Sequence, residues 1–104
     1  MNNLKLNLSG TNVGDKEPTY IIAEIGQNHN GDIEIAKQLI DMAARCKVNA
    51  VKFQKRDMNC ELTKQAFDAP YDNKNSFGKT YGEHRIKLEL NFEEHNRLMD
   101  YATK

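Results

Sequence analysis

Apolar and polar positions alternate at the start of the chain. Leu4, Leu6 and Leu8 are separated by polar residues, which is the period of a half-buried strand, and residues 9–12 are of the types that form turns. This pattern predicts a small hairpin within an N-terminal unit, residues 1–18.

The next unit, residues 19–54, has the pattern of a strand, a helix and a second strand. Residues 20–26 form a nearly continuous β-prone apolar run that ends in glycine, as expected for a parallel strand covered on both faces. Asp32 can cap a helix whose apolar positions recur every three or four residues. These positions are Ile33, Ala36, Leu39, Ile40 and Ala43. Residues 50–54 then resemble a second strand, so this unit is predicted to be βαβ, with its strands parallel.

The third unit, residues 55–104, begins without a clear period. Loop-type residues dominate residues 55–90, and so long a loop in a compact domain is uncommon unless it is functional or disordered. Asn91 can then cap a terminal helix, with Glu94 reaching back as in a capping box. We expect the buried stripe of this helix to consist of Leu98, Tyr101 and Ala102.

Composition narrows the classes of function. Lys and Arg total 15 in 104 residues and are balanced by 15 Asp and Glu, so the chain lacks the positive charge that nucleic-acid binding requires. No apolar stretch is long enough to span a bilayer and no targeting signal is visible, which predicts a cytoplasmic protein without a membrane partner. Cys46 and Cys60 are too few and too far apart for a disulfide framework or a zinc pair, so reduced thiols are expected.

Three polar side chains lie near the carboxyl ends of the two predicted strands, where ligands bind in parallel α/β sheets. Alternation along the strands can direct Glu24 from the first, and Lys52 and Gln54 from the second, toward one site. A charge within an apolar strand is costly to bury unless it is paired or faces a cavity. A structural Glu24–Lys52 ion pair and a ligand site both fit, and the two interpretations are not exclusive.

The three histidines give weaker signals. His29 follows the first strand and is either a ligand or general acid or, more commonly for such a residue, solvated or bonded to the backbone. His84 and His95 have no companion at metal-ligand spacing, so no metal-binding residue is assigned, and His95 is expected at the surface. Residues 27–32 and 55–90 should border the ligand-facing end of the sheet.

Two motifs resemble the N-acetylneuraminate (sialic acid) synthase family. The first consists of residues 21–32, the helix of residues 35–44 and the strand of residues 50–54. The second, residues 75–85, is similar to the second strand-to-helix segment of that family. The resemblance covers about residues 13–104.

This resemblance implies an α/β fold, the N-terminal fragment of a (β/α)8 TIM barrel. The family condenses phosphoenolpyruvate with an N-acylated amino sugar of the N-acetylmannosamine type to a nonulosonic acid and releases phosphate, a C–C bond-forming transferase reaction of sialic acid biosynthesis. A divalent metal, Mn²⁺ or Mg²⁺, polarises the sugar aldehyde as a Lewis acid, with ligands expected outside this chain. The full-length enzyme is expected to be a homodimer.

The same resemblance suggests roles for individual residues. Glu24 is expected to be the catalytic carboxylate that handles protons or orients the attacking water. Lys52 is expected to bind the carboxylate of phosphoenolpyruvate, and Gln54 to contact the sugar. Tyr81 and Arg85 are expected to be substrate-binding residues.

The chain departs from the family in two ways. The family usually has glycine where this chain has Lys47, and a left-handed helix end costs a non-glycine residue on the order of 1 kcal/mol. A closed barrel also needs roughly 200 to 250 residues, so the chain resembles a truncated enzyme that is inactive alone. The alternative is a non-catalytic accessory or assembly module that pairs with another chain through an open sheet edge.

Overall fold

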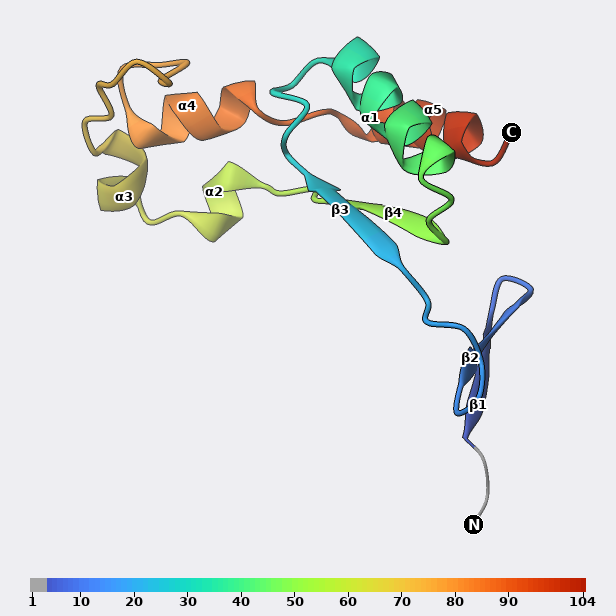
Figure 1. The fold of residues 1–104 in the computed structure, drawn as a ribbon. Coiled ribbons are helices and arrows are strands. Elements are labelled where there is room, and N and C mark those ends of the chain that lie inside the picture. The colour runs from blue at the N-terminus through green and yellow to red at the C-terminus, as the bar shows by residue number, and fades with distance from the viewer. Residues whose placement is uncertain (1–3) are drawn as a thin grey trace.

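The computed structural model describes residues 4–104, so residues 1–3 of the predicted N-terminal unit lie outside the described residues. The predicted hairpin is confirmed: β1 (Lys5–Leu8) pairs with β2 (Thr11–Gly14) in antiparallel register. Both turn residues, Ser9 and Gly10, have the positive φ that tight hairpin turns favour, at 49° and 92°. The hairpin lies at the amino end of the next strand, away from the helices (Figure 1), and its leucines are exposed rather than half-buried.

The predicted βαβ unit is also confirmed. It consists of β3 (Ile22–Gly26), α1 (Ile33–Arg45) and β4 (Ala50–Phe53). The two strands pair in parallel, and their register places Glu24 opposite Lys52.

Helix α1 forms where its cap and its apolar stripe predict it. The Asp32 carboxylate accepts a hydrogen bond from the Glu34 N–H at 2.8 Å, which satisfies one of the free donors of the first turn. The buried positions of the helix are Ala36, Ile40 and Ala43, all on the predicted stripe. They pack over one face of the β3–β4 sheet, so the helix covers that face.

Residues 55–90 are only partly a loop: residues 69–80 are not helical, as predicted, but helices occupy much of the rest. They contain three short helices: α2 (Met58–Glu61), α3 (Lys64–Asp68) and α4 (Tyr81–Lys87). The first residue before each helix caps it with a side-chain oxygen; these residues are Asp57, Thr63 and Thr80. Helices this short complete only one or two turns, so hydrophobic periodicity cannot reveal them. The three helices lie beyond the carboxyl ends of β3 and β4 (Figure 1).

Helix α5 (Phe92–Ala102) confirms the predicted terminal helix and its capping box. The Asn91 side chain accepts from the Glu94 N–H at 2.8 Å, and the Glu94 carboxylate accepts from the Asn91 N–H at 3.0 Å. On the predicted stripe, Leu98 is buried and Tyr101 half-buried, whereas Ala102 is exposed.

The sheet is covered on one face only within the described residues. Helices α1 and α5 pack together on one side, where Ile25, Leu90 and Leu98 belong to the core cluster. The opposite face carries Ile22, which is 54% exposed. The expectation of a strand covered on both faces is therefore not met within this chain.

The described chain is open in shape. Residues 4–104 form one antiparallel and one parallel two-stranded sheet, so a closed barrel stays a prediction. The radius of gyration is 17.6 Å, against about 13 Å for a compact domain of this length. Both cysteines are free, as predicted. In the described part of the chain, no helix has the length and apolar character needed to cross a membrane.

Candidate functional site

Glu24 and Lys52 form an ion pair on the open face of the sheet. The parallel register places them opposite each other, and Lys52 Nζ lies 3.4 Å from Glu24 Oε1. Their side chains are 57% and 58% exposed, because α1 covers the other face. Of the two interpretations that the sequence allowed, the ion pair is present. Because the pair is exposed, a ligand site at the same residues remains compatible with the structure.

Gln54 lies beside Gly26, just beyond the ends of the two strands. The sheet register shifts between Glu24 and Gly26, and Gly26 has a φ of 58°, which favours glycine. This irregularity lets the Gln54 N–H donate to the Gly26 carbonyl at 3.4 Å. The Gln54 side chain in turn accepts a hydrogen bond from Arg56, with Nη2 2.6 Å from Oε1.

Tyr81 and Arg85 lie on α4 and bind each other. The Arg85 guanidinium donates to the Tyr81 hydroxyl, and its Nη2 lies 3.4 Å from Glu61 Oε1 on α2. Glu61 Oε2 lies 3.9 Å from Nε of Arg56, which binds Gln54. Within residues 4–104, this chain of contacts links the two α4 residues to the strand ends, and no direct hydrogen bond or ion pair joins them to Glu24 or Lys52.

A polar pocket of about 520 Å³ lies between the loop after β3 and the segment before α4. Its lining includes Gln27, Asn28, Asn30, Tyr71, Asn75 and His84. The two segments that were predicted to border one site therefore share a pocket. Both come after the carboxyl ends of the parallel strands, as the general placement of α/β binding sites requires.

Glu89 joins these segments, and sequence reasoning missed it. Its carboxylate accepts hydrogen bonds from the Gln27 side-chain amide and, at 3.1 Å, from the Arg56 N–H. Lys55 Nζ lies 3.4 Å from the same carboxylate, whose side chain is only 12% exposed. The only signal in the sequence is a single acidic residue between Leu88 and Leu90, which is too common a pattern to single out.

His29 is a structural residue of the loop after β3. It is 1% exposed, and its Nδ1 accepts from the Gly31 N–H at 3.0 Å, which bears out the backbone-bonded alternative and excludes the solvated one. Its Nε2 is buried without a hydrogen-bond partner. Burial lowers the pKa of His29 below its ordinary value of 6.5, and nearby His95 lowers it further.

The prediction that His95 lies at the surface is wrong. Its ring is half-buried against Phe53, with centroids 6.2 Å apart, and its Nε2 is buried without a partner. Burial lowers the pKa of His95, and the charge of Lys55 lowers it further. His95 is partly buried because the start of α5 packs against the end of β4, a contact that the sequence does not indicate.

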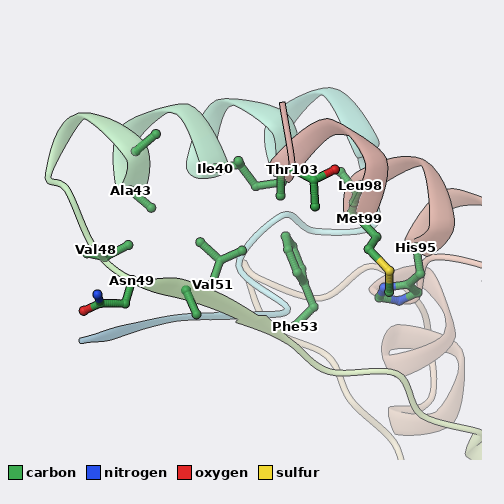
Figure 2. A pocket seen from close by; sticks show the side chains of 13 residues that line it. Ile40, Ala43, Val48, Asn49, Val51, Phe53, His95, Leu98, Met99 and Thr103 are labelled. Atoms are coloured by element: carbon green, nitrogen blue, oxygen red, sulfur yellow. The ribbon is translucent and has the colours of Figure 1, made fainter. Parts of the chain in front are cut away.

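An apolar groove of about 480 Å³ lies on the helix side of the sheet. Figure 2 shows its lining, which comes mainly from α1, β4 and α5 and includes Ile40, Val51, Phe53 and Met99. No Lys, Arg, Asp or Glu lines this groove, so it offers an anionic substrate no lysine or arginine as an ion-pair partner. The ionic groups at the strand ends are the better candidate site.

The described residues do not provide a metal site. Among residues 4–104, no three His, Cys, Asp or Glu side chains are close enough together to hold an ion.

Comparisons with known proteins identify related sequences. The NeuB family model matches residues 39–104, more than half of the chain. The chain is 47% identical over 90 residues to N-acetylneuraminate-9-phosphate synthase of Mus musculus, covering 86% of this chain and 25% of that protein. It is 43% identical over 88 residues to N,N'-diacetyllegionaminic acid synthase of Campylobacter jejuni, covering 83% of this chain and 26% of that protein.

Solved structures agree with these sequences. The fold matches N-acetylneuraminic acid (sialic acid) synthetase from Leptospira borgpetersenii with a TM-score of 0.72 and 27% identity, over 97% of this chain and 31% of that one. It matches spore coat polysaccharide biosynthesis protein spsE from Bacillus subtilis with a TM-score of 0.64 and 29% identity, over 96% and 25% of the two chains. The chain spans about a quarter of the length of the curated relatives it matches. On the family match, the chain belongs to the NeuB family.

Proposed function

We propose that this chain is the N-terminal part of an enzyme that condenses phosphoenolpyruvate with an N-acylated amino sugar of the N-acetylmannosamine type. The product is a nonulosonic acid, and phosphate is released. Relatives that are synthases of sialic and legionaminic acids support this reaction class. The observation that carries the proposal is the exposed Glu24–Lys52 pair at the carboxyl ends of two parallel strands.

Lys52 is proposed to bind the carboxylate of phosphoenolpyruvate. Its ammonium is a compact charge with three N–H donors, and Glu24 is its one ion-pair partner within residues 4–104. The side chain is 58% exposed, so a carboxylate can approach it without breaking packed structure. Binding there brings phosphoenolpyruvate beside Glu24.

Glu24 is proposed to act on the water that completes the reaction. The enol carbon of phosphoenolpyruvate attacks the open-chain aldehyde of the sugar, water attacks the resulting cationic carbon, and phosphate leaves. An ionised carboxylate has only acceptor oxygens, so Glu24 can orient that water and take its proton. Because Glu24 lies next to Lys52, its carboxylate would be beside the bound phosphoenolpyruvate, within reach of the attacking water.

Gln54, Tyr81 and Arg85 complete the proposed substrate-binding set. Gln54 is proposed to contact the sugar, since it lies at the strand ends beside Gly26. Tyr81 and Arg85 are proposed to bind substrate at a greater distance from Glu24 and Lys52, because Arg85 pairs with Glu61 on α2.

The complete enzyme is proposed to use Mn²⁺ or Mg²⁺, to form a homodimer and to act in the cytoplasm. The metal would supply Lewis-acid polarisation of the sugar aldehyde. Its ligands would have to come from outside residues 4–104, within which no metal-binding cluster is found.

The test is a chimera in which this chain replaces the matching segment of the mouse synthase. Phosphate release from phosphoenolpyruvate would be measured with N-acetylmannosamine and with its 6-phosphate, in the presence of Mn²⁺. We expect the chimera to be active, Lys52→Met to raise the KM for phosphoenolpyruvate, and Glu24→Gln to lower kcat. Lys64→Met, at an exposed lysine on α3 whose ion-pair partner is Asp68, is the matched control.

Two outcomes would contradict the proposal. One is a chimera that has a normal circular dichroism spectrum and melting temperature but releases no phosphate. The other is an active chimera in which Lys52→Met and Glu24→Gln behave like Lys64→Met.

The accessory-module alternative has one observation in its favour. Within residues 4–104, β3 and β4 pair only with each other, which leaves two sheet edges open to another chain. The isolated chain would be mixed with mouse synthase that lacks the matching segment. If activity is restored and the Glu24→Ala chain cannot restore it, the chain supplies part of the active site. If the variant restores activity equally well, the chain is an assembly module.

A further inference from the structure

A hydrogen bond joins the side chains of Arg56 and Gln54. The Arg56 guanidinium donates from Nη2 to Gln54 Oε1 at 2.6 Å, and both side chains are half-buried. A guanidinium has five N–H donors and no acceptor. Only the carbonyl end of the Gln54 amide can therefore face Arg56 favourably, and its NH2 group must face the other way.

Contacts with two acidic residues hold Arg56 in place. Its backbone N–H donates to the Glu89 carboxylate at 3.1 Å, and its Nε lies 3.9 Å from Glu61 on α2. Glu89 is itself only 12% exposed and also binds Gln27 in the loop after β3. The hydrogen bond to Glu89 fixes the backbone of Arg56, while the ion pair with Glu61 and the hydrogen bond to Gln54 restrain its guanidinium before any ligand arrives.

We propose that Arg56 is a positioning residue that makes Gln54 a hydrogen-bond donor toward the substrate. This inference rests on the proposed function, in which Gln54 contacts the sugar. The amide then offers two N–H groups, which select an acceptor oxygen of the sugar, such as its N-acyl carbonyl, rather than a donor. Without Arg56 the amide could turn over and lose this preference.

The experiment uses the chimera with the mouse synthase and measures KM for each substrate and kcat separately. Arg56→Met removes the guanidinium and keeps an unbranched apolar stem. We expect the KM for N-acetylmannosamine to rise roughly two- to tenfold, the range for losing a preorganised side chain. The KM for phosphoenolpyruvate and kcat should stay within about twofold, because Lys52 and Glu24 do not depend on Arg56.

Further variants separate positioning from general stability. Arg56→Lys keeps a donor and should return the sugar KM toward that of the parent. Arg56→Gln can donate or accept, so it permits both amide orientations and replaces Arg56→Met if that variant does not fold. Arg45→Met, at an exposed arginine at the end of α1, is the matched control and should leave all constants unchanged.

A double-mutant cycle decides the outcome. If Arg56 acts through Gln54, Arg56→Met has no further effect on the sugar KM in the Gln54→Ala background. If Gln54→Ala raises the sugar KM but Arg56→Met does not, or acts equally in both backgrounds, the positioning proposal is overturned and the proposed function stands. If Gln54→Ala leaves the sugar KM unchanged, both the sugar contact of Gln54 and its positioning by Arg56 are overturned.

Discussion

The exposure of Glu24 and Lys52 determines what their ion pair contributes. A buried pair that loses one partner leaves an uncompensated charge, which costs about 3 to 5 kcal/mol. Both side chains are more than half exposed here, so water solvates whichever charge is left alone. The pair therefore contributes little to stability, which frees both groups to bind a ligand.

Replacement of Lys52 by Met should change the free energy of unfolding of this chain by less than about 1 kcal/mol, the usual range for an exposed pair. Chemical denaturation of the parent and the variant measures the difference, with Lys64→Met as the control. A loss of several kcal/mol would mean that Lys52 is mainly structural, and would count against its substrate-facing role.

Stability should fall as the pH drops below about 6.5, because of His29 and His95. Burial lowers the pKa of each, with Glu89 and Glu94 acting in the opposite direction. The unfolded chain, with ordinary histidine pKa values near 6.5, then binds more protons than the folded chain. The stabilisation is thus fully present above that pH and is lost as the pH falls toward the lower folded-state values.

Denaturation curves at pH 7.5 and pH 5.5 test this expectation. His95→Gln removes one titrating group, so the difference in stability between the two pH values should become smaller. An equal difference in parent and variant would show that other groups cause the pH dependence.

At the scale of elements, local capping decides where helices begin and end. Asp32, Thr80 and Asn91 each accept a backbone N–H hydrogen bond at the start of a helix. The end of α1 is less favourable, because Lys47 takes a left-handed φ of 59° where glycine is preferred. Lys47 therefore adopts the left-handed conformation that was expected at this helix end.

Lys47→Gly should stabilise the chain by about 0.5 to 1 kcal/mol. The left-handed conformation costs a non-glycine residue about 1–2 kcal/mol, and the greater freedom of glycine in the unfolded chain offsets part of the gain. Gln38→Gly, within α1, is the matched control and should destabilise by roughly 0.5–1 kcal/mol. Urea denaturation measures both, and a destabilised Lys47→Gly would contradict the expectation.

At the scale of the whole molecule, the chain has a small core and an open shape. The extents are 54 × 32 × 25 Å, and apolar residues such as Leu6, Ile22 and Phe92 are more than half exposed. The chain spans about a quarter of its curated relatives, and its candidate site is open on the face opposite α1. Substrates bound there would remain in contact with water.

The 104-residue chain alone should therefore release no phosphate from phosphoenolpyruvate. Residues 4–104 contain no cluster that could hold the metal proposed for the complete enzyme. The assay uses the purified chain with N-acetylmannosamine and Mn²⁺, and the active chimera serves as the positive control. Phosphate release above background that Glu24→Ala abolishes would contradict this expectation.

The sequence by itself determined the elements that depend on neighbouring residues. The hairpin, the βαβ unit and α5 follow from periods of two or 3.6 residues and from caps such as Asn91, which act within a single turn. The alternation of β3 and β4 likewise indicated that Glu24 and Lys52 lie together, and the register and their ion pair confirm this. The three short helices of residues 55–90 were not predicted, because they are too short to show a hydrophobic period.

Only the tertiary structure decided which distant groups meet. Glu89 binds Gln27 across 62 positions of sequence, and Arg85 reaches Glu61 across 24. The burial of His29 and His95 depends in the same way on the packing of α5 against the end of β4. Such contacts leave no local signal in the sequence, neither a hydrophobic period nor a helix cap. They form only when packed elements bring distant parts of the chain together. The orientation of Gln54 by Arg56 is a partial exception: the two residues are close in sequence, but Glu61 and Glu89 hold the arginine in place.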